Sequence, residues 1–258
     1  MKVGGEMPNI RFNHKNNPSY LLVHEINDSF LPSVDIRTMK VPGRAGEHRF
    51  SKNIGMREIS VVMSIAGENE RDVKNKARAV ANFWLHTDSP AQFVNLDEPD
   101  IFYLAEVADA GKLAQKLSLG RATVTFLCPD PHAYRITESV VSLAALPASG
   151  AIEFINEGKD VFPRFRMTFT GDASHFSLVT ENRRLTFGRP GGPVVFRNND
   201  VLVIDGERGL ILKGNERFYD ALSPDSEFPK LHHGFNAVKF EQRASVRNVE
   251  MRLRKRWF

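Results

Sequence analysis

The stretch ISVVMSI, residues 59–65, places an apolar side chain at every second position, with Ser60 and Ser64 on the alternate face. This period of two is typical of a β-strand that has one buried and one solvated face. The same alternation returns at residues 121–128, 164–169 and 249–254. Together these segments predict a mainly β fold built from antiparallel sheets, each with one face against a core.

One helix is predicted, at about residues 70–86. Four apolar residues recur there at spacings of four, three and four: Val73, Ala77, Val80 and Trp84. This spacing puts them on one face of a helix, so the Trp84 ring is expected in the core. Asn69 is a suitable N-cap, and Ser89-Pro90 prevents the helix from continuing.

A domain boundary is expected between residues 135 and 160. The turn Pro129-Asp-Pro131 ends the first set of strands, Leu146–Gly150 has the composition of a linker, and a new β pattern begins at Ile152. We therefore predict an N-terminal β domain with one helix at residues 1–140 and an all-β domain at residues 141–258.

Composition excludes several classes of protein. The chain has 258 residues, a formal net charge of +4 and one cysteine, Cys128. The charge is too small for a dedicated nucleic-acid-binding protein, and one cysteine allows neither an intrachain disulfide nor a multi-cysteine metal site. The first ten residues lack the apolar segment of a signal peptide, and no apolar run is long enough to span a bilayer. Cys128 follows the strand alternation into an apolar face and is expected to be buried.

No catalytic or cofactor motif is present, so we expect no enzymatic activity, no cofactor and no metal. The acidic residues of Asp97–Asp100 could imitate a glycosidase carboxylate pair, but around Pro99 they favour a solvated turn. His232 and His233 could offer metal-binding nitrogens, yet adjacent side chains on a strand face opposite sides, which favours a loop.

The C-terminal end of the chain is basic. It contains four cationic residues: Arg252, Arg254, Lys255 and Arg256. Their alternation with the apolar residues of 249–253 favours a solvated sheet face, ahead of a protein contact and, last, a nucleic-acid contact.

The order of the sequence signals resembles the distal tail protein (Dit) family of siphophages. The N-terminal signals are Val41-Pro-Gly-Arg-Ala-Gly46, the helix ending in Trp84-Leu85, the turn Asp97-Glu-Pro-Asp100 and the strand end Phe126-Leu-Cys-Pro-Asp-Pro131. The C-terminal signals are Asn156-Glu-Gly158, Val161-Phe-Pro-Arg-Phe165, Asp200-Val-Leu-Val-Ile-Asp205, the late Ser226–Leu231 and Gly234-Phe-Asn236 segments, and the terminal Arg256-Trp-Phe258.

This resemblance implies a β-sandwich-like N-terminal domain with one α-helix and a galectin-like C-terminal β-sandwich. It implies a structural hub at the virion tail tip, made in the bacterial host cytoplasm and without a membrane partner. Such proteins form a hexameric ring that joins the tail tube protein to the tail-associated fibre or lysin protein and, in some phages, to receptor-binding proteins. DNA passes the central channel without specific binding.

Residues 30–39 and the loop after them are the expected ring contact. The candidate interface residues are Phe30, Ile36, Pro42, Gly43 and Arg44. The basic residues 252–256 are expected to lie away from the channel, because a channel for DNA should not hold DNA tightly.

A carbohydrate-binding, lectin-like module is the alternative function, since a fold does not by itself determine a function. Sugar sites present aromatic rings beside polar groups, and the two tryptophans are Trp84, which is expected in the core, and Trp257. A screen against cell-wall glycans would separate a lectin from a ring subunit.

Overall fold

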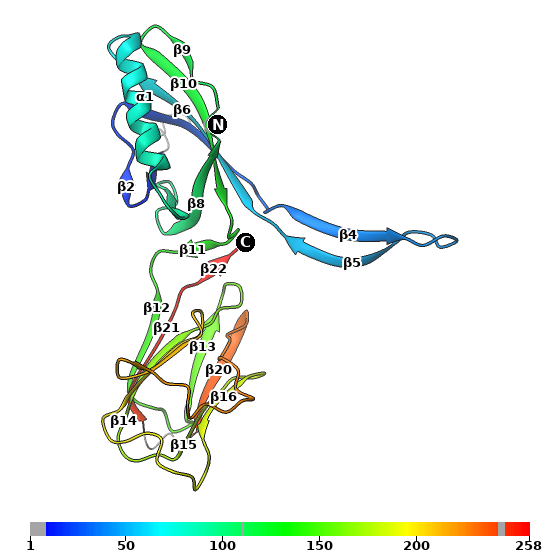
Figure 1. The fold of residues 1–258 in the computed structure, drawn as a ribbon, viewed down its shortest axis with the longest axis vertical. Helices are drawn as coiled ribbons and strands as arrows, with labels where there is room; N and C mark the ends of the chain where they lie inside the picture. The colour runs from blue at the N-terminus through cyan, green and yellow to red at the C-terminus, as the bar shows by residue number, and fades with distance from the viewer. Residues whose placement is uncertain (1–8, 110, 242–245) are drawn as a thin grey trace. The chain divides into compact units, whose positions relative to one another are not determined.

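The computed structural model describes residues 9–109, 111–241 and 246–258 (Figure 1). The chain forms two compact units, the first ending at Ile136 and including Phe258, the second running from Thr137 to Trp257. This division falls four residues before the boundary at 140/141 expected from the sequence.

Unit 1 contains an antiparallel sheet with the strand order β2-β1-β7-β8-β10-β6-β3. Two short strands are added to it, β9 on β10 and β11 on β8. The bounds are β1 Ile10–Phe12, β2 Lys15–Asn16, β3 Leu21–Asp28, β6 Arg57–Ala66, β7 Ala91–Asn95, β8 Ile101–Asp109, β9 Ala114–Lys116, β10 Leu119–Cys128 and β11 Ala133–Arg135.

The predicted alternation of residues 59–65 is confirmed in β6, which lies between β10 and β3. The apolar side chains of its inner face, at positions 59, 61, 63 and 65, are at most 4% exposed. They meet those of β10 across the ladder, with Ile59 opposite Phe126 and Val61 opposite Val124. Cys128, at the end of β10, is fully buried, as predicted. The apolar face of this pair forms the floor of the unit 1 core.

The predicted helix is confirmed as α1, Glu70–Leu85, and Figure 1 shows it alongside the sheet. The side chain of Asn69 caps it by accepting a hydrogen bond from the backbone N–H of Asp72. Its buried residues are Val73, Val80 and Trp84. The Trp84 ring meets Phe126 edge to face at 5.4 Å between centroids, so the helix closes the core over β10.

The chain between β3 and β6 forms a separate two-stranded sheet. It consists of β4, Val34–Lys40, and β5, Glu47–Ile54. Within the ranges that the structure describes, these strands pair with each other and with no third strand. We call this hairpin the arm, and the residues that join it to β3 and β6, 29–33 and 55–56, its root.

Unit 2 is a sandwich of two antiparallel sheets. The six-stranded sheet has the order β12-β21-β14-β17-β18-β19, and the four-stranded sheet β13-β20-β15-β16. The bounds are β12 Ser139–Ala145, β13 Ala151–Asn156, β14 Arg164–Phe169, β15 His175–Val179, β16 Arg184–Gly188, β17 Val201–Asp205, β18 Leu210–Lys213, β19 Glu216–Arg217, β20 Gly234–Glu241, β21 Val246–Leu253 and β22 Arg256–Trp257.

The inner faces of both sheets share one aromatic core. Phe169 of β14 and Phe176 of β15 are fully buried and meet edge to face at 5.3 Å. Phe196, from the segment before β17, stacks on Phe169 at 4.1 Å. The predicted alternations at 164–169 and 249–254 are confirmed, because their apolar members face this core.

The expectation of an interdomain linker at Leu146–Gly150 is wrong. This segment is a turn inside unit 2 that joins β12 to β13, closed by a hydrogen bond from the Gly150 N–H to the Pro147 carbonyl at 2.8 Å. Leu146 packs against the unit 2 core. Proline and glycine mark a chain reversal, and their presence alone does not separate a turn from a linker.

Candidate assembly surface

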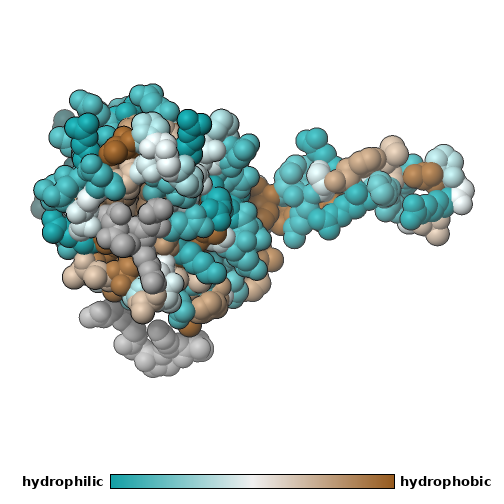
Figure 2. Space-filling model, turned by 90° about the horizontal axis from the view of Figure 1, so that it is seen from below, coloured by the Kyte–Doolittle hydropathy of each residue, from teal (hydrophilic) through white to brown (hydrophobic). Residues whose placement is uncertain are grey.

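The arm extends clear of the sheet of its own unit (Figure 1). Every residue of β4 is exposed, and in β5 only Ser51 is partly covered. Figure 2 shows it as a projection with hydrophobic residues among hydrophilic ones. An isolated two-stranded hairpin has marginal stability in water, so this geometry favours a further surface that covers the arm.

One face of the arm near its root is apolar. Val34 lies directly opposite Ile54, and Ile36 lies opposite Lys52. Because cross-strand partners and every second residue share a face, Val34, Ile36 and Ile54 form one stripe. Their exposed fractions are 44%, 51% and 43%, so this stripe meets no core in the monomer.

The ladder of the arm is irregular between Arg37 and Thr38, opposite Phe50. The extra residue of such a bulge increases local twist and bends the ribbon. Phe50 is 61% exposed and meets the His48 ring edge to face at 5.2 Å. The bulge thus adds an exposed aromatic residue to the outer half of the arm.

The tip of the arm is the Val41–Gly46 loop. Gly43 and Gly46 adopt positive φ angles of 78° and 83°, which side chains other than glycine seldom adopt. The Arg44 N–H donates to the Val41 carbonyl at 3.2 Å and tightens the turn. The loop encloses a shallow hollow of about 450 Å³. The structure therefore gathers Pro42, Gly43 and Arg44 at one end of the arm.

The other sequence candidates lie on the same arm. Ile36 belongs to the apolar stripe, and Phe30 stands at the root with 92% of its surface exposed. Leu31 and Met56, also at the root, are 60% and 49% exposed. All five candidate residues thus occupy one continuous segment, from its root to its tip.

The arm is also cationic. Residues 34–54 contain five Lys or Arg and two Asp or Glu, a net charge of +3. Exposed ion pairs join Asp35 to Arg37 at 3.6 Å and Lys40 to Glu47 at 3.8 Å. Such exposed pairs contribute little to stability, so most of this charge is available to a partner.

A buried arginine, which sequence reasoning did not single out, fixes the root of the arm. Arg57 donates from Nη1 to Asp28 Oδ1 at 3.0 Å and to the Ser29 carbonyl at 2.6 Å, and from Nε to the Pro131 carbonyl at 3.1 Å. Its side chain is 4% exposed. These bonds join the end of β3 to the start of β6, so they hold both strands where the arm leaves the sheet.

Tyr103 of β8 completes this root cluster. Its hydroxyl donates to Asp28 Oδ2 at 2.8 Å, and the Arg57 guanidinium lies 5.3 Å from its ring centre. Burial and the neighbouring Asp28 carboxylate raise the pKa of Tyr103, which keeps the phenol neutral and able to donate. No spacing in the sequence connects these three residues, which come from three strands.

The acidic turn at 97–100 and the adjacent His232 and His233 form local hydrogen bonds. Asp97–Asp100 is an exposed turn, as predicted, in which the Asn95 side chain accepts from the Asp97 N–H at 3.0 Å. His232 binds Asp160 and His233 binds the Gly158 carbonyl, so the two rings have separate partners. Among the described residues, no three His, Cys, Asp or Glu side chains gather as a metal site, and no helix is long and apolar enough to cross a membrane.

Three of the four residues of the basic end form ion pairs within unit 2, so this end is only partly a solvated face. Arg252 pairs with Glu250 at 2.6 Å, Arg254 with Glu138 at 3.2 Å and Lys255 with Glu157 at 2.7 Å; Arg256 donates to the Asp160 carbonyl at 2.8 Å. The Lys255 side chain is 12% exposed, which corrects the expectation that all four residues face water. β21 ends at Leu253, so the strand alternation does not extend to the basic residues after it.

Comparison with known proteins connects both units to phage tails. Residues 16–128 match the phage tail protein RIFT-related domain, and residues 159–257 match the C-terminal domain of siphovirus-type tail components. No curated protein matches the sequence.

One solved structure shares the fold over nearly the whole chain. The Dit protein of phage SPP1, described as a paradigm of the hub of the adsorption apparatus in phages that infect Gram-positive bacteria, has a TM-score of 0.83 at 17% identity. The match covers 98% of this chain and 100% of that one. A chain of the phage P2 baseplate in its activated conformation with calcium covers 96% and 97%, at 8% identity and a TM-score of 0.48.

Proposed function

Because the chain belongs to the siphophage distal tail protein family, as a tail hub or baseplate component, we propose that its copies close into a ring at the tail tip. In this ring the arm of each copy packs against unit 1 of the next. The arm and its receiving surface are two different patches, which is the head-to-tail contact that closes by rotation. Six copies are the number that the family resemblance implies. The role is structural, without a catalytic step.

The observation that carries this proposal is the uncovered arm. Its apolar stripe is exposed in the monomer, and its two strands have no third strand among the described residues. Stable interfaces involve roughly 20–30 residues on each side. Residues 34–54 together with the root residues Phe30, Leu31 and Met56 number 24, which is enough for one side of such a contact.

The proposed partners follow from the family. The ring would join the tail tube protein to the tail-associated fibre or lysin protein and, in some phages, to receptor-binding proteins, with unit 2 directed outward. Synthesis takes place in the host cytoplasm before assembly into the virion. The adsorption-hub role described for SPP1 Dit supports this placement.

DNA would pass the centre of the ring without specific binding. We place the basic residues 252–256 away from this channel. Three of these side chains form ion pairs inside unit 2 and Arg256 donates to a carbonyl there, which leaves little free positive charge to hold phosphates. A ring structure with these residues lining the channel would contradict this part of the proposal.

The solution mass of the purified chain tests the ring. Light scattering should give about 175 kDa, six times the subunit mass of 29.1 kDa, and negative-stain images should show a central hole. A mass of 29.1 kDa at every protein concentration would overturn self-assembly through the arm.

Two substitutions test whether the arm, and not another part of the surface, makes the ring contact. Phe30→Asp and Ile36→Asp should each yield a folded monomer, because both side chains are exposed in the subunit but would be covered in the ring. Val194→Asp is the matched control, since Val194 lies in unit 2 and is 50% exposed, close to the 51% of Ile36. The control should keep the ring; intact rings from both arm variants would remove the arm from the interface.

A further inference from the structure

A groove of about 550 Å³ lies on unit 2. Its lining comes from the end of β15, the turn that follows it, the segment before β20, and β20 itself: Val179, Thr180, Glu181, Lys230, His232, Phe235, Asn236, Ala237 and Lys239. Its volume is within the range of sites that hold small molecules.

The floor of the groove is the outer face of β20. Val238 and Phe240 point into the sandwich core, so Phe235, Ala237 and Lys239 alternate to the outside. Phe235 is 66% exposed, which is unusual for an aromatic side chain at the start of a central strand. The floor therefore presents an exposed phenyl ring beside the small side chain of Ala237.

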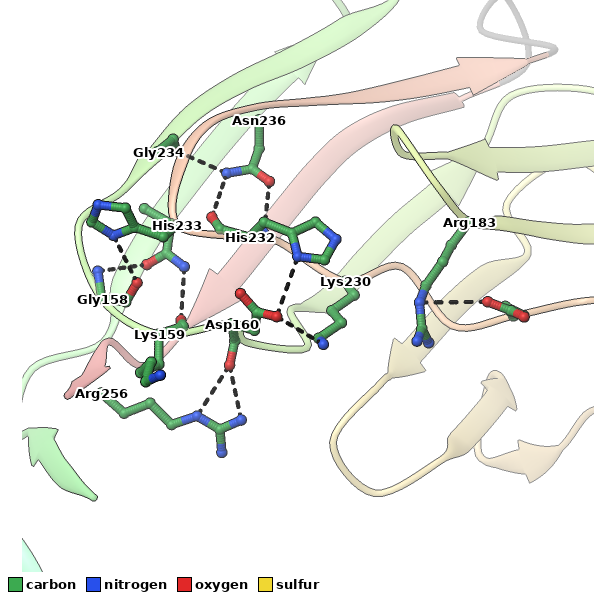
Figure 3. A network of polar contacts seen from close by, with 12 residues as sticks. Gly158, Lys159, Asp160, Arg183, Lys230, His232, His233, Gly234, Asn236 and Arg256 are labelled. Carbon is green, nitrogen blue, oxygen red and sulfur yellow. Dashed lines mark hydrogen bonds and ion pairs between the residues drawn. The ribbon is translucent and has the colours of Figure 1, made fainter. Parts of the chain in front are cut away.

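One wall is held in place by a polar network (Figure 3). The Asn236 side chain accepts from the His232 N–H at 2.8 Å and donates to the His232 and Gly234 carbonyls at 2.8 and 2.9 Å. These three bonds fix the segment that turns into β20, where Gly234 has a φ of 94°. Because its wall is fixed in advance, the groove needs little ordering when a ligand binds.

Asp160 binds two residues of the same wall. Its carboxylate binds Lys230 Nζ at 2.8 Å and His232 Nδ1 at 3.2 Å, and its carbonyl accepts two bonds from Arg256. The hydrogen bond from Lys230 lowers the pKa of Asp160, so the carboxylate stays ionised at neutral pH. The Nε2 atom of His232 has no bond to a described residue and remains open to a ligand.

The charges around the groove cancel. Lys230 is neutralised by Asp160, while Glu181 and Lys239 carry opposite charges and form no ion pair with a described residue. The groove thus offers a carboxylate acceptor, an ammonium donor and an imidazole nitrogen around an apolar floor, with no excess of either sign. A strongly charged ligand would gain little here.

We propose that this groove binds a neutral saccharide, with one pyranose ring lying on Phe235. A pyranose has an apolar C–H face, which suits the phenyl ring, and hydroxyl groups at its edge that both donate and accept. Glu181 and His232 Nε2 would accept from these hydroxyls, and Lys239 would donate to them. The lining has neither the clustered basic side chains that select phosphate or sulfate nor the uniformly apolar walls that select a lipid tail.

Saturation-transfer NMR on the full-length protein tests this directly. The probes are the methyl glycosides of glucose, galactose, rhamnose and N-acetylglucosamine, each at about 10 mM to detect millimolar binding. At least one should show saturation transfer, strongest at the C–H protons of one face of the ring. Glucose 6-phosphate and glucuronic acid are the charged comparators and should bind more weakly.

Phe235→Ala should weaken that binding roughly tenfold or more, because the stacking surface is lost. Phe50→Ala is the matched control, since Phe50 is 61% exposed but lies on the arm of unit 1; it should leave sugar binding unchanged. Absence of binding by every neutral glycoside, equal binding by Phe235→Ala, or a preference for the charged sugars would overturn the proposal. Phe235→Ala should keep the ring, so failure here is distinguishable from failure of the ring proposal.

Discussion

The Arg57 guanidinium donates to the Asp28 carboxylate across 3.0 Å, although 29 positions of sequence separate the two residues. All of the intervening chain from Phe30 to Met56 belongs to the arm or its root. The pair therefore joins the two strands from which the arm departs, and it couples the stability of unit 1 to the position of the proposed ring contact.

Arg57→Ala should lower the free energy of unfolding of unit 1 by about 2–4 kcal/mol, because it leaves Asp28 Oδ1 and two carbonyls without their donor. Urea denaturation followed by circular dichroism measures this. Arg37→Ala, at an exposed arginine of the arm, should cost less than about 1 kcal/mol. Equal effects of the two substitutions would contradict a structural role of the buried pair.

Trp84→Ala should destabilise unit 1 by roughly 3–5 kcal/mol, because the indole fills the core between α1 and Phe126. Trp84→Phe should cost much less. The Trp84 Nε1–H is buried without a hydrogen-bond partner among the described residues, so its removal leaves no acceptor unsatisfied. The melting temperatures of both variants distinguish a packing role from a polar one. Similar decreases in melting temperature for the two variants would indicate that the Nε1–H makes a hydrogen bond.

Cys128 should be inert in the native protein. Burial, assisted by the negative charge of Asp28, raises the pKa of its thiol to about 12, so almost no thiolate is present at neutral pH. A chromogenic disulfide reagent should therefore release no colour from the folded chain and one equivalent after denaturation, since the sequence has one cysteine. Rapid reaction of the native protein would show that β10 opens frequently.

Asp130 should make the stability of unit 1 sensitive to acid. Burial acts to raise its pKa, but hydrogen bonds from Tyr134 and His132 outweigh this and hold the pKa below the ordinary 3.8. A depressed folded-state pKa stabilises the fold above the unfolded-state value, and this stabilisation is lost as pH falls through the folded-state pKa.

Asp130→Asn should therefore be less stable than the wild type at neutral pH by up to about 1 kcal/mol, because the hydrogen bonds to the charged acceptor weaken and solvent screens this partly exposed group. The difference should shrink as pH falls below 3.8. Urea titrations at neutral and acidic pH test this. A difference that stays constant across this pH range would assign the effect to packing.

Substitutions in the arm should have little effect on the stability of the monomer but a clear effect on ring formation. Ile54→Ala should change the unfolding free energy of the isolated subunit by less than about 0.5 kcal/mol, because the side chain is 43% exposed and touches no core. It should weaken the ring measurably in light scattering at low protein concentration. Val140→Ala, at a 48% exposed position of unit 2, is the control and should leave both quantities unchanged.

The sequence by itself determined the elements whose signals are local. Alternation at residues 59–65 predicts β6 because neighbouring side chains of a strand point to opposite faces, and the spacing from Val73 to Trp84 predicts α1 for the corresponding helical reason. The burial of Cys128 followed from the same alternation. The ordered motifs of both halves also indicate the family from the sequence alone.

Only the tertiary structure decided what covers each face and which distant residues meet. Val34 and Ile36 alternate like members of a half-buried strand, yet they project from the sheet uncovered, because alternation identifies an apolar face but not the surface it meets. Asp28 with Arg57, and Asp160 with His232 at 72 positions' separation, are brought together by strand pairing and chain reversal. Such contacts depend on the path of the whole chain, which no local pattern encodes.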